Sequence, residues 1–317
     1  MTDRSYVIGI DIGGQTSRVG VVDADGRIAG RSVIRTDVYG NDAQAYVSAL
    51  SSAVKEAVMS CGEPVVAGIG VGVPNGNYFS GEVAYAPNLS WATDKVVPLA
   101  EMLSKSLGGI KVRLTNDANA AAMGEMAYGV ARGMTDFIEI TLGTGLGSGI
   151  VCGGKLVYGH DGLAGELGHV CVERDGRLCG CGKRGCLETY VSATGVVKTA
   201  KERIAAGEQS SLCGLEDFTS KDVYDAAVKG DKLSQEVFRY TGEILGRAMS
   251  DFVAFSSPEA IVLFGGLMKA GDLLLKPAVE AMEQNLMPVW KGKIKVLKSS
   301  LNEGDAAILG ASALGWD

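Results

Sequence analysis

The 317-residue sequence predicts an α/β fold in which one sheet architecture occurs twice. Apolar strand-like runs alternate with longer segments whose apolar residues recur at helical spacing, as in chains that join strands by crossover helices. Residues 135–159 also repeat the pattern of residues 5–30, with an apolar strand, a glycine-bearing turn, a second strand and a third. Gly13 of the first copy aligns with Gly143 of the second. The repeat therefore indicates two domains of the same kind.

Periodicity and apolar runs predict the individual elements. Residues 65–73 (VVAGIGVGV) form a continuous apolar run typical of a strand buried in a parallel sheet, whereas residues 42–60 have helical periodicity. In the first half we expect strands at 6–14, 16–28, 29–36, 65–73 and 110–117, helices at 42–60 and 94–107, and a helix that starts within 118–129. In the second half we expect strands within 135–159 and at 259–268 and 293–300, and helices at 191–207, 220–230, 234–257 and 305–316.

The overall composition excludes several classes of protein. The formal net charge is −7 and no basic cluster stands out, so we expect no nucleic-acid partner. The first residues lack the apolar core of a secretory signal, and no apolar run is long enough to span a bilayer, so we expect no membrane partner and a cytoplasmic location. In that reducing compartment, the seven cysteines favour free thiols or metal ligands over structural disulfides.

Two glycine-rich loops, at residues 10–17 (IDIGGQTS) and 140–148 (ITLGTGLGS), are candidate phosphate sites because their backbone N–H groups can wrap an anion. Neither matches a Walker A loop or a dinucleotide fingerprint, and tight hairpin turns would explain each loop alone. Their matching places in the repeat, with a third glycine turn at 263–266, favour nucleotide binding in a cleft between the copies. Asp11 would hold Mg²⁺ through water, or alternatively cap a turn.

Acidic and amide residues follow the strand expected at 110–117. Asn116 and Asp117 lie where that strand gives way to a helix, at the strand end where ligands bind in α/β sheets. Asp117 could accept a proton from a substrate hydroxyl, and capping of the helix is the alternative role. Glu166 and His169 are three residues apart and would share one face of a helical turn. With Asn116, Asp117 and Glu188 they would form a polar group suited to a sugar.

One histidine and three cysteines have the spacing of a metal site. His169, Cys179, Cys181 and Cys186 give H-x9-C-x-C-x4-C, a Cys₃His set that leaves no position for a catalytic water. We interpret it as a structural Zn²⁺ site that orders the segment between Glu166 and Glu188, with disulfides as the alternative. The remaining cysteines lack such an arrangement and are expected to be ordinary buried or partly buried thiols: Cys61, Cys152, Cys171 and Cys213.

These motifs together resemble the ROK family (repressor, open reading frame, kinase) of sugar kinases, and bacterial glucokinases most closely. The resemblance covers essentially the whole chain, and residues 162–188 are its most specific part. It is carried by IDIGGQTSRVG (10–20), APNLSW (86–91), LTNDANAAAMGE (114–125), TLGTGLGSGIV (141–151), GLAGELGH (162–169), CGCGKRGCLE (179–188) and VLFGG (262–266).

The resemblance implies an actin-like ATPase fold, with two RNase-H-like domains and an interdomain cleft. It implies a small domain of residues 1–117 plus 304–317, and a large domain of residues 118–303 that carries the zinc-binding loop and the dimerisation helices. It also implies ATP-dependent phosphorylation of the 6-hydroxyl of glucose, with Mg²⁺, structural Zn²⁺ and a homodimer.

The same resemblance implies roles for individual residues, with Asp117 as the catalytic base. The implied sugar contacts are Gly76, Asn88, Asn116, Asp117, Glu166, His169 and Glu188. The implied nucleotide contacts are Asp11, Gly13, Gly14, Gln15, Thr16, Thr144, Gly145, Gly265 and Gly266. The implied zinc ligands are His169, Cys179, Cys181 and Cys186.

Two positions depart from the family pattern. Gln15 stands where many members have a phosphate-contacting threonine, so Thr16 and Ser17 are expected to supply hydroxyls instead. Asn75 stands where the family often has glycine, near the expected sugar site. Both departures concern details of binding rather than the reaction.

Other functions within the family share these motifs. Kinases for N-acetylmannosamine, N-acetylglucosamine, mannose, fructose or allose are alternatives to a glucokinase, because one contact changes selectivity by only ~1–3 kcal/mol. A sugar-responsive transcriptional repressor would need a winged helix-turn-helix before the first strand, for which we expect no room ahead of Tyr6. An inactive sugar sensor is disfavoured because Asp117 and both phosphate loops are present.

Overall fold

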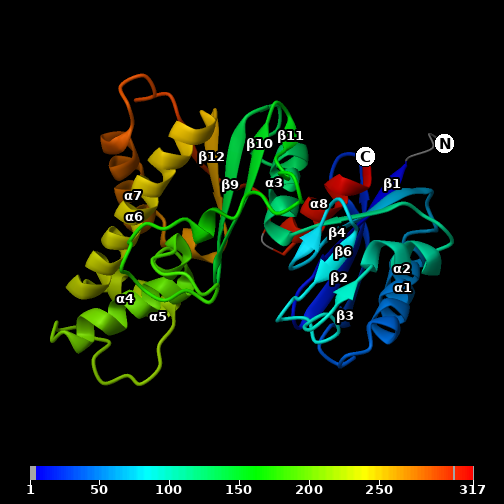
Figure 1. Ribbon diagram of the computed structural model, residues 1–317, viewed down its shortest axis with the longest axis horizontal. Helices are drawn as coiled ribbons and strands as arrows, with labels where there is room; N and C mark the ends of the chain where they lie inside the picture. The colour runs from blue at the N-terminus through cyan, green and yellow to red at the C-terminus, as the bar shows by residue number, and fades with distance from the viewer. Residues whose placement is uncertain (1–4, 303, 317) are drawn as a thin grey trace. The chain divides into compact units, whose positions relative to one another are not determined.

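The structure is a computed structural model that describes residues 5–302 and 304–316 (Figure 1). The chain forms two compact units. The first unit takes its described residues from Met1–Met134, Lys155–Gly165 and Ser300–Asp317, and the second comprises Thr135–Gly154 and Glu166–Ser299.

A five-stranded sheet in the order β3-β2-β1-β4-β8 forms the centre of the first unit. Its strands are β1 (Tyr6–Ile12), β2 (Thr16–Asp23), β3 (Ile28–Arg35), β4 (Val66–Gly72) and β8 (Val112–Thr115). β1, β2 and β3 form antiparallel pairs, whereas β4 is parallel to β1 and β8 is parallel to β4. The hairpins begin and end close to the residues predicted from the sequence.

Helices cover both faces of this sheet. Helix α1 (Ala43–Ser60) packs on β2 and β3 and contacts α2 (Leu99–Ser106), while α8 (Ala306–Ala313) packs on β1, β2 and β4 and contacts α3 (Asp117–Tyr128). The α8 backbone comes so close to the sheet that a Cβ on Gly9 would lie 2.1 Å from the Ile308 carbonyl oxygen. Glycine in β1 therefore permits this close packing.

A small three-stranded sheet also belongs to the first unit. It consists of β5 (Gly76–Asn77), β6 (Glu82–Ala84) and β7 (Val96–Val97). The short turn η4 (Leu314–Trp316) follows α8. The helix predicted at 94–107 was placed too early, because Val96 and Val97 pair with β6 and Pro98 caps the helix that starts at Leu99. A proline cannot donate a backbone hydrogen bond, so it fits a helix start.

The second unit repeats the sheet of the first, in the order β11-β10-β9-β12-β13. Its strands are β9 (Phe137–Leu142), β10 (Leu146–Cys152), β11 (Lys155–Leu156), β12 (Ala260–Phe264) and β13 (Lys295–Lys298). As in the first unit, an antiparallel hairpin is followed by strands parallel to its first member. The repeat predicted from the sequence is confirmed.

Helices make up most of the rest of the second unit. They are α4 (Ala193–Ala205), α5 (Ser220–Val228), α6 (Lys232–Ser256) and α7 (Asp272–Asn285), with short turns η1 (Leu167–His169), η2 (Leu187–Thr189) and η3 (Gly266–Ala270). α6 and α7 lie side by side (Figure 1). α7 was not predicted, and it contains Pro277.

The contacts of α3 differ from the domain boundary expected from the sequence. Its residues were expected in the large domain, but α3 packs against α8 and belongs to the first unit. Within the described residues, every helix is too short or too polar to cross a membrane.

Candidate active site and metal centre

The first glycine loop is a tight turn between β1 and β2. The Gly13 N–H donates to the Thr16 carbonyl at 3.0 Å, and the Gln15 carbonyl accepts from the Thr36 N–H at 2.8 Å. Gln15 itself is exposed, so its side chain is free of the core. A Cβ on Gly14 would lie 3.0 Å from the Asn88 carbonyl oxygen. The absence of a side chain at Gly14 thus lets the predicted phosphate loop pack directly on the predicted sugar-binding loop.

Asp11 lies at the end of β1, beside this loop. Its carboxylate is 4.0 Å from the Arg18 guanidinium and is partly buried. The pKa of Asp11 is raised to about 6, chiefly by burial; Arg18 opposes this increase and the nearby Asp117 carboxylate contributes to it. A carboxylate in this position can hold a water-clad divalent cation, which would favour its charged form.

Asn116 and Asp117 have separate roles at the start of α3. Asn116 is the N-cap, with its side-chain oxygen accepting from the Asn119 N–H at 2.7 Å. Asp117 is the first helical residue and accepts from the Ala118 N–H at 2.9 Å. Asn116 therefore caps the helix, and the side chain of Asp117 is not needed for that role.

The Asp117 carboxyl combines solvent access with a raised pKa. Asp117 is exposed to solvent. Protein atoms packed around its carboxyl raise the pKa of the group by desolvation, and hydrogen bonds from backbone N–H groups at the start of α3 oppose this increase. Because Asp117 is exposed, a substrate can reach its carboxyl group. A reachable carboxylate with a raised pKa is suited to accept a proton.

The turn between β4 and β5 explains both Asn75 and Gly76. Asn75 has a left-handed backbone with φ of 56°, which asparagine and glycine tolerate best. Its side-chain amide donates to the carbonyls of Ala84 and Tyr85, both at 3.0 Å. A Cβ on Gly76 would lie 2.8 Å from the Thr115 carbonyl, so this turn packs against the strand that leads into Asn116. The Asn75 amide therefore holds the loop.

The second glycine loop, in the other unit, contacts Glu188. Glu188 lies in η2, and its Oε2 accepts from the Leu146 N–H at 3.0 Å. A Cβ on Gly145 would lie only 2.3 Å from that oxygen. Glycine at this position is therefore required for the carboxylate to reach the loop. Glu188, a predicted sugar contact, is therefore hydrogen-bonded to the loop that carries the predicted phosphate contact Gly145.

Glu166 and His169 come together as predicted from their spacing. Glu166 directly precedes the turn η1, and its Oε2 lies 4.0 Å from Nε2 of His169. Both side chains are partly exposed. The turn packs on β10, since the Leu167 N–H donates to the Ser148 hydroxyl at 3.1 Å. The pair is thus held on the same strand that begins beside Glu188.

The four predicted metal ligands form one cluster. The ligand atoms of His169, Cys179, Cys181 and Cys186 all lie within 4.8 Å of one another. Nδ1 of His169 is 3.6 Å from the Cys179 sulfur, and the Cys181 and Cys186 sulfurs are 3.7 Å apart. Tetrahedral coordination with metal–sulfur bonds of about 2.3 Å and metal–nitrogen bonds of about 2.0 Å places neighbouring ligand atoms about 3.5–3.8 Å apart. The donor set therefore fits a tetrahedral metal ion.

The histidine orientation separates its two nitrogens. Nδ1 belongs to the cluster, whereas Nε2 faces Glu166. The Cys179 sulfur also lies 3.8 Å from Oε1 of Glu188. The metal cluster thus contacts both acidic residues that flank it in the sequence.

The remaining cysteines differ in part from the expectation. All seven cysteines are free thiols, so no disulfide competes with the cluster. Cys61 is partly buried as expected, but Cys152, Cys171 and Cys213 are exposed, which corrects that prediction.

The third glycine turn lies next to the second. Gly265 follows β12 with a φ of 102°, and a Cβ there would lie 2.5 Å from the Leu142 carbonyl. β12 is parallel to β9, so Gly265 and Gly266 follow the same sheet edge as Thr144 and Gly145. The four residues predicted to contact nucleotide in this unit are therefore neighbours.

Sequence reasoning missed the start of α4 as part of this site. Ser192 is the N-cap and also donates to the Glu188 carbonyl at 2.7 Å. The Thr194 hydroxyl donates to the Thr144 carbonyl at 2.9 Å, and the Ala193 N–H donates to the Gly143 carbonyl at 2.8 Å. Serine before a helical run was the available signal, but it indicates a cap and not a ligand site.

A cavity of about 500 Å³ opens beside this helix start. Thr144 of the second glycine loop is in its wall, together with Thr194, Val197 and Lys198 of α4 and Phe218 and Thr219 from the segment before α5. Its wall is mostly apolar apart from the loop and the lysines. An apolar cavity that adjoins a phosphate loop is suited to the base of a nucleotide.

Each unit therefore brings together its own set of the residues predicted from the sequence. In the first unit, the loops after the parallel strands β1, β4 and β8 carry Asp11, Gly13, Gly14, Gly76, Asn116 and Asp117 at one sheet edge, and Asn88 packs against Gly14. In the second unit, Thr144, Gly145, Glu166, His169, Glu188 and the metal ligands form one connected group.

Two units with the same strand arrangement, each with a glycine turn at the sheet edge, define a protein of the actin-like ATPase class, as the resemblance implied. The ROK family profile matches residues 7–317, and the chain belongs to the ROK family. A glucokinase of Thermotoga maritima is 36% identical over 314 residues, with 97% of this chain and 96% of the relative covered.

Solved structures agree with this placement. A ROK-family glucokinase from Streptomyces griseus, in complex with glucose and AMPPNP, superimposes with a TM-score of 0.78 at 35% identity, covering 98% of this chain and 99% of that one. A ROK hexokinase from Thermus thermophilus superimposes with a TM-score of 0.84 at 26% identity, covering 98% of each chain.

Proposed function

We propose that this protein is an ATP-dependent glucokinase that transfers the γ-phosphoryl group of ATP to the 6-hydroxyl of glucose. The observation that carries the proposal is the Asp117 carboxylate, which is accessible at the start of α3 while Asn116 caps the helix. Similarity to glucokinases over almost the whole chain supports glucose as the sugar.

In this mechanism Asp117 accepts the proton of the 6-hydroxyl as its oxygen attacks the γ-phosphorus. The Ala118 N–H fixes one carboxylate oxygen at 2.9 Å, so the group is oriented before substrate binds. Mg²⁺, when bound with the nucleotide, neutralises phosphate charge, and Asp11 is the carboxylate placed to hold its water shell. Positioning of the hydroxyl and the carboxylate supplies most of the catalysis in such a reaction.

The nucleotide is proposed to lie along the glycine loops. Backbone N–H groups of Gly13–Thr16 and Thr144–Gly145 would bind phosphates, and the cavity beside α4 would take the base. Thr16 and the exposed Gln15 offer side-chain donors at the first loop. Ser17 is fully buried and its hydroxyl lies 2.7 Å from both the Thr36 and the Tyr46 hydroxyls, so it is a structural group instead.

The residues proposed for sugar contact, as the family resemblance implies, are Gly76, Asn88, Asn116, Glu166, His169 and Glu188. The cluster of His169 and three cysteines is proposed to hold Zn²⁺, because thiolate and imidazole ligands in tetrahedral array suit that ion. Zinc there would fix the ring of His169 through Nδ1 and leave Nε2 for a sugar hydroxyl. The cytoplasmic location and the homodimer implied by the resemblance stay predictions.

A paired substitution in the second glycine loop tests the sugar contacts. Gly145→Ala is expected to raise the KM for glucose at least about 10-fold, the effect of losing one charged hydrogen bond of ~1.5–3 kcal/mol, because the new Cβ displaces Glu188. Gly143→Ala is the matched control, since a Cβ there meets nothing within 4 Å. The measurement is steady-state kinetics with varied glucose concentration. A wild-type KM for glucose in both variants would contradict the role of Glu188.

The acid limb of the pH profile tests Asp11. Its raised pKa of about 6 means that the carboxyl becomes protonated as pH falls below that value and can no longer hold a cation. We therefore expect kcat/KM for MgATP to fall with decreasing pH below about 6, and the raised pKa of Asp117 acts in the same direction. A profile that stays flat between pH 7 and pH 5 would contradict both roles.

A further inference from the structure

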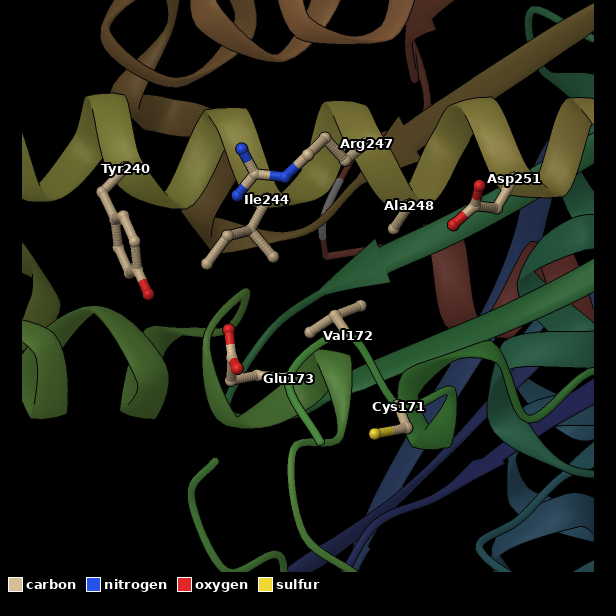
Figure 2. A pocket seen from close by; sticks show the side chains of 8 residues that line it. All are labelled: Cys171, Val172, Glu173, Tyr240, Ile244, Arg247, Ala248 and Asp251. Carbon is tan, nitrogen blue, oxygen red and sulfur yellow. The ribbon is translucent and has the colours of Figure 1, made fainter. Parts of the chain in front are cut away.

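Cys171 is an exposed free thiol shortly after His169, beside the metal cluster but not part of it. Figure 2 shows its side chain in the wall of a groove of about 290 Å³ between α6 and the segment 171–173. Cys186, by contrast, is fully buried. Because oxidation of a thiol depends on access to its sulfur, an oxidant that enters the groove meets Cys171 before Cys186.

Cys171 lies directly opposite Cys186 across an antiparallel backbone bridge. Two backbone hydrogen bonds join the residues on either side of the two cysteines, from the Val172 N–H to the Gly185 carbonyl at 2.8 Å and from the Leu187 N–H to the Val170 carbonyl at 2.9 Å. The cysteines therefore form a pair without mutual hydrogen bonds. In pairs of this kind opposite Cα atoms are about 4.5 Å apart and the side chains lie closest.

This arrangement is one that a disulfide can span. Disulfides usually join Cα atoms about 4.4–6.8 Å apart, and side chains directly opposite each other lie on the same face of an antiparallel pair. We therefore expect a disulfide to need rotation of side chains and little movement of the backbone. The Cys181 and Cys186 sulfurs are also close, at 3.7 Å, but both belong to the cluster, where a bound metal would share their electron pairs.

We propose that Cys171 is a peroxide-reactive thiol that forms a disulfide with Cys186 and thereby removes a ligand from the metal cluster. The pairing is inferred from the backbone contacts of the two cysteines, whereas its effect on the metal rests on the proposed zinc cluster. The cluster would then respond to oxidation as well as support the sugar site, because oxidation at its edge dismantles it.

The chemistry consists of two steps. The Cys171 sulfur attacks one oxygen of hydrogen peroxide, the O–O bond breaks, water leaves, and the sulfur is oxidised to a sulfenic acid. The Cys186 sulfur then attacks the Cys171 sulfur and the S–O bond breaks. The oxygen leaves as a second water, with the proton of the Cys186 thiol or, where the metal holds the thiolate, with one from solvent. Two thiols and one peroxide thus give one disulfide and two waters.

Loss of Cys186 from the cluster would affect the proposed sugar contacts. Cys186 directly precedes η2, which carries Glu188, and the Cys179 sulfur of the cluster lies 3.8 Å from the Glu188 carboxylate. Nδ1 of His169 belongs to the same cluster. Oxidation is therefore expected to release the metal and to weaken glucose binding together.

Peptide mass spectrometry tests the pairing without any substrate. The metal-loaded protein is treated with equimolar hydrogen peroxide, its remaining thiols are alkylated, and it is digested without reductant. We expect a linked peptide that joins Cys171 to Cys186, loss of two of the seven free thiols, and release of the metal. Treatment with a thiol reductant is expected to restore all seven thiols by exchange with the disulfide.

Cys171→Ser is the decisive variant and Cys213→Ser its matched control, since both residues are exposed thiols outside the cluster. Before oxidation both variants are expected to match the wild type in turnover and metal content. After peroxide, Cys171→Ser is expected to keep its metal, whereas Cys213→Ser is expected to lose it as the wild type does. Metal release from Cys171→Ser at the wild-type rate, or a link between Cys181 and Cys186 in place of the expected peptide, would overturn the proposal.

These outcomes are separate from the proposed glucokinase activity, because peptides and metal are measured without glucose or ATP. An active enzyme that gives no linked peptide would contradict the disulfide alone. A linked peptide in a protein without turnover on any sugar would contradict the proposed function alone. Purified protein that holds no metal would contradict the zinc cluster, and the linked peptide would then decide the pairing by itself.

Discussion

Asp117→Asn is expected to lower the rate of phosphoryl transfer by about 10²–10⁴-fold, the range typical of a lost general base. Asparagine keeps the size and can still accept from the Ala118 N–H, so α3 and the loop geometry are expected to survive. Glucose binding, measured by calorimetry, is expected to remain within a few fold of wild type. The variant thereby separates proton transfer from sugar recognition.

A matched control for this variant is Asp42→Asn. Asp42 caps α1 by accepting from the Ala45 N–H at 2.9 Å, and asparagine caps helices about equally well. It is expected to retain wild-type turnover. Wild-type turnover in Asp117→Asn itself would remove Asp117 from the role of base and leave the proposed mechanism without one.

Removal of the metal is expected to have the second large effect. Structural zinc contributes about 10–16 kcal/mol in small zinc peptides at neutral pH. Loss of even a third of that, ~4 kcal/mol, would lower the thermal midpoint by roughly 8–16 °C in a domain of this size. Turnover is expected to fall with it, because Glu166, His169 and Glu188 are all held by the cluster or beside it.

Cys186→Ser is the corresponding substitution, since Cys186 is fully buried within the cluster. Cys213→Ser is the control, because Cys213 is an exposed thiol outside the cluster. Thermal melts should be combined with metal analysis of the same samples. An unchanged midpoint after verified metal loss would contradict a structural role for the ion.

The fold was largely predictable because its strands are short apolar runs that end in glycine or polar residues. The two hairpins of the repeat, the buried strand β4 and the helix after Asn116 all follow from such local signals. The missed helix α7 contains Pro277, which argues against a helix locally, yet its Leu274 and Ala278 pack against glycines of α6. Tertiary packing decided that element, and a single sequence does not show such packing.

The metal ligands, and the flanking glutamates Glu166 and Glu188, were predictable for a different reason. His169, Cys179, Cys181 and Cys186 are close in sequence, so a short loop must bring them together. The hydrogen bonds from the start of α4 to the loop at Thr144 link segments 50 residues apart and have no such signature. The role of Asn75 was also hidden, because its amide contacts backbone carbonyls of a neighbouring turn.

The most direct test of the central claim is ADP release with MgATP against a panel of glucose, mannose, fructose, N-acetylglucosamine and N-acetylmannosamine. We predict clear turnover on glucose and weak turnover on the others. Turnover mainly on an N-acetyl sugar would keep Asp117 as the base but contradict glucose as the substrate. Absence of turnover on every sugar, with sugar binding intact, would contradict the kinase and favour a sugar sensor.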